Sequence, residues 1–175
     1  RPALVVAPLR VARDVWPNEI HEWPHLEHMK IVPVLGTPHQ RLDALRKHAD
    51  VYTINFENLE WLIGTLWDRW PFGSIVIDES TKIKSLRASV RKNKQGTEFV
   101  AGQGGARAKA LLKVVYQHKP SRFIELSGTP ASKGLQDLWG QIYFLDYGKR
   151  LGNVFEAFKN RWFRQSYDGF SIEPQ

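Results

Sequence analysis

Two adjacent carboxylates, Asp78 and Glu79, end an apolar, β-branched run and are the residues best suited to chemistry in this sequence. The run Ser74–Ile77 predicts a buried parallel strand, because parallel strands are covered on both faces and need not alternate. Ligands of open α/β sheets lie just beyond the carboxyl ends of strands, so this pair would lie beside a substrate. One carboxylate can hold Mg²⁺ while the other activates water. The alternative is a solvated acidic turn that only ends the strand.

A second apolar strand, Arg122–Leu126, runs into the polar turn Ser127-Gly128-Thr129-Pro130. The glycine permits unusual backbone dihedral angles, and the two hydroxyls can bond to a neighbouring carboxylate or phosphate. The two stretches therefore share one pattern, an apolar strand with polar groups at its carboxyl end.

These stretches resemble known motifs in both order and spacing. Asp78–Thr81 resembles the DEAH-type box (motif II), and Leu126–Pro130 resembles motif III, of the SNF2 family of superfamily 2 helicase-like ATPases. The continuation through Gly134–Trp139 and Tyr143–Asp146 is similar to the helix that follows motif III, particularly in phage and prophage members. The resemblance covers the chain from about Ala3 to Phe163.

The resemblance implies an ATP site with Mg²⁺ as its ion. Asp78 would hold the magnesium and Glu79 would activate the attacking water. Ser127 and Thr129 would couple the state of the nucleotide to the nucleic-acid track, and Gly128 would complete the nucleotide-binding group.

It also implies contacts with the DNA backbone. The segment after the first strand resembles motif Ia, which makes Arg10 a candidate phosphate contact; the alternative is a solvated arginine. The turn that begins at Thr53 resembles motif Ib, so Thr53 and Asn55 could bond phosphates. The alternative for Asn55 is that it only caps the next helix.

The region from Lys82 to Arg122 is strongly basic. It carries eleven Lys or Arg residues against one acid, a net charge of +10, whereas the whole chain carries +7. Glycines and weak periodicity from residue 93 to 105 predict a mobile loop within a basic insertion at about 85–105. Such a loop beside a nucleic-acid track can contact phosphate, and the candidates are Lys84, Arg91, Lys92 and Lys94. A solvated, disordered loop is the alternative.

A phosphate-binding glycine loop is not found in this sequence. The stretch Gly102–Lys109 fails the Walker A pattern, because Ala110 stands where Ser or Thr is required. The family places its phosphate loop before motif Ia, and the second RecA-like lobe is not recognisable either. We therefore expect residues 1–175 to be part of the first RecA-like lobe, and we expect this piece alone to be inactive.

Composition and periodicity predict one soluble α/β domain with a mainly parallel sheet. The chain has 175 residues, 42% of them hydrophobic, and no cysteine, which suits the cytoplasm and excludes thiol chemistry. No apolar run approaches the roughly 20 residues that span a membrane. Besides the two strands above, strands are expected at residues 3–8, 30–36 and 50–55. Helices are expected at 11–23, 38–48, 56–67, 135–145 and 154–163, and the tail from Gln165 is expected to be loose.

The function predicted from the sequence is that of a DNA-dependent ATPase motor, a helicase or translocase, of which this chain is part. One alternative is a non-catalytic nucleic-acid-binding module of the same fold. Another is the motor subunit of a restriction system, which shares the motifs and differs in its partners.

Overall fold

The structure, a computed structural model, describes residues 1–167 and 172–175. The chain divides into two compact units. The sheet unit contains residues 1–80 and 114–128, and the hairpin unit contains residues 81–113 and 129–175.

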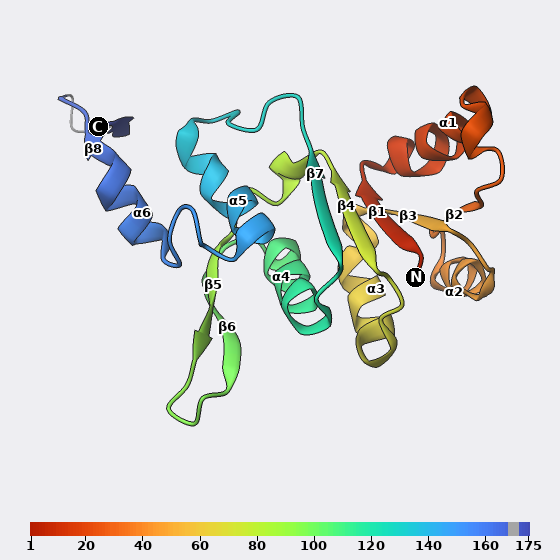
Figure 1. The fold of residues 1–175 in the computed structure, drawn as a ribbon, viewed down its shortest axis with the longest axis horizontal. Coiled ribbons are helices and arrows are strands. Elements are labelled where there is room, and N and C mark those ends of the chain that lie inside the picture. The colour runs from red at the N-terminus through yellow and green to blue at the C-terminus, as the bar shows by residue number, and fades with distance from the viewer. Residues whose placement is uncertain (168–171) are drawn as a thin grey trace. The chain divides into compact units, whose positions relative to one another are not determined.

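The sheet unit is built on five parallel strands in the order β2-β3-β1-β4-β7 (Figure 1). These are β1 (Ala3–Ala7), β2 (Ile31–Pro33), β3 (Val51–Asn55), β4 (Ser74–Asp78) and β7 (Arg122–Leu126). All five strands predicted from apolar runs are confirmed, and so is the α/β class. Strand β2 is shorter than predicted and lies at an edge, as expected of a strand that contains Pro33.

Three helices belong wholly to this unit: α1 (Trp16–Glu22), α2 (Pro38–Arg46) and α3 (Leu59–Leu66). A π-helical turn, Val11–Val15, precedes α1. Helix α2 begins with a capping box, in which Thr37 and Gln40 satisfy each other's backbone N–H groups. The helices predicted at 11–23, 38–48 and 56–67 are thus confirmed, with π or 3₁₀ turns at some of their ends.

Apolar side chains cover both faces of the central strands. Val5, Ala7, Val51 and Ala12 form a buried cluster on the face that also receives Trp16. On the opposite face, the strand register sets Leu4 level with Tyr52 and Ile75, and all three are buried. Burial on both faces explains why these strands read as continuous apolar runs.

The hairpin unit contains an antiparallel pair and helices. The pair is β5 (Arg87–Lys92) with β6 (Glu98–Gln103). The helices are α5 (Leu138–Asp146) and α6 (Phe155–Trp162), and α4 (Ala106–His118) contributes residues 106–113. The last two strands, β8 (Phe163–Gln165) and β9 (Ile172–Pro174), also pair. The prediction of a loose tail from Gln165 was therefore wrong for 165 and 172–174, while 168–171 lie outside the described residues.

The prediction of a mobile loop at 93–105 was also wrong. Residues 98–103 form β6, and only 93–97 make the turn of a hairpin. The side-chain oxygen of Asn93 accepts hydrogen bonds from the backbone N–H groups of Gln95 and Thr97 (3.0 and 2.8 Å), and Gly96 takes a φ of 81°. An Asx-type bond and a glycine with positive φ are the local chemistry that closes a turn.

Candidate functional site

The carboxyl ends of four parallel strands meet at one edge of the sheet. Ala7 is level with Asn55, and Asp78 is level with Leu126. The acidic pair and Ser127-Gly128 therefore come from neighbouring strands and lie at the same edge. The loop that leads to Arg10 leaves this edge from β1. Thr129 belongs to the hairpin unit, so only the other four predicted nucleotide-binding residues are brought together within the sheet unit.

Asp78 is the last residue of β4 and is held by a tryptophan. The Nε1–H of Trp16 donates to Oδ2 of Asp78 at 2.9 Å, across a sequence separation of 62 residues. Within residues 1–167 and 172–175, the other oxygen, Oδ1, accepts no hydrogen bond. The bond from Trp16 thus orients the carboxylate of Asp78 through one oxygen, and the second oxygen is available for a ligand.

Glu79 adopts a left-handed backbone conformation, with φ of 76°. Few residues other than glycine occupy this region, and such strained residues gather at functional sites. The backbone N–H of Glu79 donates to the carbonyl of Leu126 at 3.0 Å, so the turn is tied to β7. The hydroxyl of Ser127 donates to Oε1 of Glu79 at 3.4 Å, a long bond. The two predicted motifs therefore contact each other through these side chains.

Gly128 leaves open space beside this contact, because a Cβ atom built on it would meet nothing within 4 Å. The described residues include no group of three or more His, Cys, Asp or Glu side chains that could hold a metal ion. Mg²⁺ needs fewer protein ligands than such a group supplies, since one or two carboxylates bind it and water and phosphates complete its coordination shell. The free Oδ1 of Asp78 and the neighbouring carboxylate of Glu79 fit that donor set.

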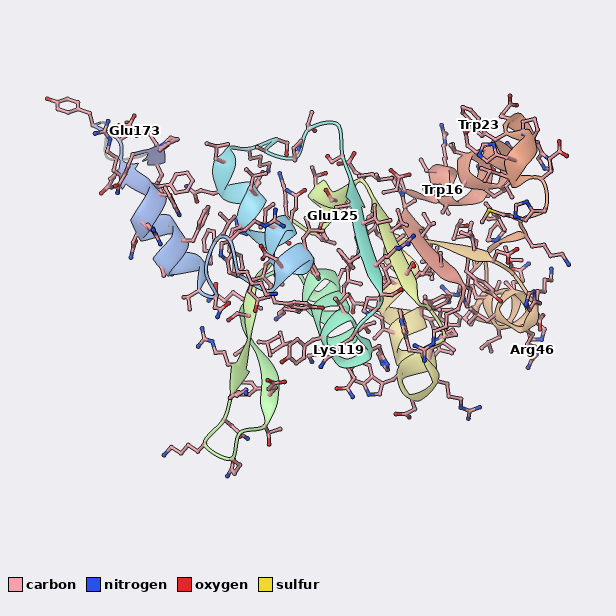
Figure 2. The ribbon with its side chains drawn as sticks, in the orientation of Figure 1. Trp16, Trp23, Arg46, Lys119, Glu125 and Glu173 are labelled. Carbon is pink, nitrogen blue, oxygen red and sulfur yellow. The ribbon has the colours of Figure 1, made fainter. Side chains whose placement is uncertain are left out.

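Glu125 is a half-buried acid in β7 that sequence reasoning missed (Figure 2). Its Oε1 lies out of contact with solvent and has no hydrogen-bond partner among the described residues. Burial raises the pKa of Glu125 from 4.5 to about 8. The signal was present in the sequence, because a lone acid stands within the apolar run Phe123–Leu126.

Thr53 and Asn55 are already engaged inside the sheet unit. Thr53 is fully buried, and its hydroxyl donates to the carbonyl of Ala12 at 2.5 Å. Asn55 is 6% exposed; its amide donates to Glu57 at 2.7 Å, and its oxygen accepts from Asn58 at 2.6 Å. The Thr53 side chain therefore supports the π-helical turn, and its predicted contact with phosphate, through the side chain or the backbone, stays a prediction. The Asn55 side chain makes no cap bond to the next helix.

Arg10 is exposed at the start of the π-helical turn and remains a candidate phosphate contact. Arg91, Lys92 and Lys94 are also exposed, at the outer end of the β5–β6 hairpin. These four are the predicted nucleic-acid residues whose side chains face solvent.

Lys84 differs from the other basic candidates, because its ammonium group is used inside the hairpin unit. It lies 2.7 Å from the carboxylate of Asp137 and 2.6 Å from the hydroxyl of Ser132. The two charged side chains are only 18% and 12% exposed. The structure thus gives Lys84 a role in stability, and its contact with nucleic acid stays a prediction.

Replacing Lys84 by methionine should lower the free energy of unfolding by about 2–3 kcal/mol, because Asp137 would keep a poorly hydrated charge without its partner. Thermal or urea unfolding measures this loss. The double variant Lys84→Met/Asp137→Leu should recover most of it. A Lys84→Met protein that is as stable as wild type but binds DNA more weakly would support the predicted contact of Lys84 with phosphate.

Comparison with known proteins adds a relative from a phage. The chain is 45% identical over 166 residues, 94% of its length, to protein p41 of Acyrthosiphon pisum secondary endosymbiont phage 1. The matched part is 33% of that protein, so the chain spans about a third of its relative's length. No family model matches the chain. Within residues 1–167 and 172–175, no helix is both long enough and apolar enough to cross a membrane.

Proposed function

We propose that this chain is part of a DNA-dependent ATPase motor, with its nucleotide site at the carboxyl edge of the sheet unit. The observation that carries the proposal is the pair Asp78 and Glu79 at the end of the internal strand β4, where Glu79 accepts a hydrogen bond from Ser127, the residue that follows β7. Ligands of open parallel sheets bind at this position. The family resemblance, which rests on motifs alone, supplies the identity of the nucleotide.

Each residue has a proposed role in the hydrolysis of ATP. Asp78 would hold the metal ion, and Glu79 would accept the proton of the attacking water. Bound Mg²⁺ would neutralise charge on the β and γ phosphates. Ser127 would link Glu79, the general base, to the end of β7. Gly128 leaves room for phosphate beside Ser127. Thr129 follows directly in the chain, at the point where the hairpin unit begins again, and would pass the state of the site to that unit.

The decisive experiment is ATP hydrolysis by the full-length protein that carries this chain, with and without DNA. Turnover that DNA stimulates and that Asp78→Asn abolishes would support the motor. DNA binding without any turnover would favour a non-catalytic nucleic-acid-binding module.

Trp16 has a positioning role in this proposal, and its effect can be tested separately. Trp16→Phe keeps an aromatic ring against the buried cluster but removes the N–H that orients Asp78. Hydrogen bonds to charged groups contribute about 1.5–3 kcal/mol, so we expect the Mg²⁺ concentration for half-maximal turnover to rise about tenfold or more.

Trp23→Phe is the matched control, since the indole of Trp23 makes the same kind of bond to the exposed Glu19 at 3.1 Å. It should leave the Mg²⁺ dependence unchanged. Equal effects of the two variants, or a lower maximal rate with unchanged Mg²⁺ dependence, would argue against this role.

A further inference from the structure

The two faces of the β5–β6 hairpin differ in chemistry. Cross-strand pairing sets Arg91 opposite Phe99 and Arg87 opposite Gln103, on the face that also carries Ser89. On the other face Lys92 stands opposite Glu98, and their charges lie 3.5 Å apart. The first, which we call the arginine face, thus combines two guanidinium groups with an aromatic ring, whereas the lysine of the second face is paired with an acid.

The base of the hairpin is fixed to the rest of its unit. The hydroxyl of the buried Tyr143 accepts a hydrogen bond from the backbone N–H of Val90 at 2.9 Å. Arg87 donates to the carbonyls of Lys84 and Leu86 (2.8 and 2.7 Å), and its guanidinium carbon lies 3.9 Å from the centre of the Phe155 ring. The arginine face is therefore held in place at one end.

The outer part of the arginine face is open. Phe99 is 47% exposed, and Arg91 is exposed with no hydrogen bond or ion pair among the described residues. Between them and the fixed base lies a cleft of about 370 Å³. Its lining comes from both strands and from the start of α6: Arg87, Ser89, Arg91, Gly102, Gln103, Val154, Phe155 and Glu156.

We propose that the arginine face binds single-stranded nucleic acid, with a base stacked on Phe99 and the adjoining phosphate paired with Arg91. An exposed ring beside a cation is the pattern of single-strand platforms, in which bases stack on aromatic side chains and basic groups follow the backbone. A paired duplex offers no free base face, so the ring favours an unpaired strand. This inference rests on the proposed function and adds the form of the nucleic acid and the residues that receive it.

The cleft contains one acid, Glu156, which would repel phosphate. Its carboxylate lies 3.4 Å from the ammonium group of Lys159, one turn along α6, so part of its charge is offset. The exposed Gln103 offers a neutral hydrogen-bonding group to a base, and Ser89, which is 3% exposed, adds a hydroxyl to the lining of the cleft. The charges and the neutral groups therefore place the phosphate at the Arg91 end of the face and the base edges towards the cleft. An acidic peptide would use the charges and leave Phe99 without a role.

Substitutions on the arginine face and a control substitution on α4 give a matched test in the full-length protein. We expect Arg91→Ala and Phe99→Ala each to weaken binding of a fluorescent single-stranded DNA oligonucleotide about tenfold. Lys113→Ala, which removes the same charge from an exposed side chain on α4 of the same unit, should change it less than about twofold. Phe99→Trp keeps an aromatic ring and should retain binding. Phe99→Leu keeps only apolar bulk and should lose it. Circular dichroism and thermal unfolding check that each variant folds.

Three results would overturn the inference: equal losses for Arg91→Ala and Lys113→Ala, unchanged single-strand binding by Phe99→Ala, or Phe99→Ala weakening duplex and single strand alike. An acidic peptide that competes with the oligonucleotide and is insensitive to Phe99→Ala would also count against it. ATP turnover is measured on the same variants. If DNA still stimulates turnover and Phe99→Ala binds single strands as wild type does, only the proposed hairpin contact is refuted. If wild type binds single strands but shows no turnover, the proposed motor function is refuted.

Discussion

Glu79→Gln is expected to lower ATP turnover in the full-length protein by about 10²–10⁴-fold and to leave nucleotide binding intact, because it removes a general base. The amide keeps the size of the side chain and an oxygen that can accept the Ser127 bond. Turnover is measured by phosphate release, and binding by calorimetry with Mg²⁺ present. Activity near that of wild type would refute the assigned role.

Two further variants separate the carboxylate from its surroundings. Glu57→Gln neutralises an exposed acid that follows β3 at the same edge of the sheet and should leave turnover unchanged. Glu79→Gly suits the left-handed backbone and should raise the free energy of unfolding by about 1 kcal/mol while still abolishing turnover. If Glu79→Gly kept its activity, neither the carboxylate nor the strain at this position would be needed for turnover.

The sheet could be predicted well from the sequence because its signal is local. Each strand is a short apolar run with a defined end, and the polar residues that follow β4 and β7 mark the edge where the site lies. The hairpin was missed because its strands are only partly apolar. Arg87–Val90 does alternate, but four glycines between 96 and 105 suggested a loop. Gly102 and Gly104 in fact permit close approach, since a Cβ on either would lie 2.6 Å from a backbone oxygen of Arg87 or Ser85.

The partners of site residues could not be predicted, because they are set by contacts between distant parts of the chain. Lys84 bonds to Asp137 at a sequence separation of 53 residues, and Thr53 bonds to Ala12 at a separation of 41. Asp78 accepts a hydrogen bond from Trp16 at a separation of 62. Sequence reasoning identified the types of group that nucleotide or phosphate chemistry needs. Only the fold shows which of those groups are already used, and this separates Arg91, which is open to solvent, from Lys84, which is not.

The pH dependence of stability should carry a clear contribution from Glu125. Its pKa in the folded protein, about 8, exceeds the ordinary value of 4.5, because burial disfavours the charged form. Below pH 4.5 the carboxyl is protonated in both the folded and unfolded states, so stability is fully present there. As the pH rises, the unfolded chain ionises first, and stability is lost until the folded state also ionises near pH 8. The loss by linkage is several kcal/mol, at most about 5.

Glu125→Gln should remove this dependence, because the amide stays neutral in both states. Urea unfolding from about pH 5 to 8 should therefore show the variant gaining stability relative to wild type as the pH rises. Glu60→Gln, which changes an exposed acid on α3, should give a curve parallel to that of wild type. Parallel curves for Glu125→Gln and wild type would mean that Glu125 is solvated. A steep difference would instead show that burial keeps the carboxyl of Glu125 neutral in the folded protein up to about pH 8.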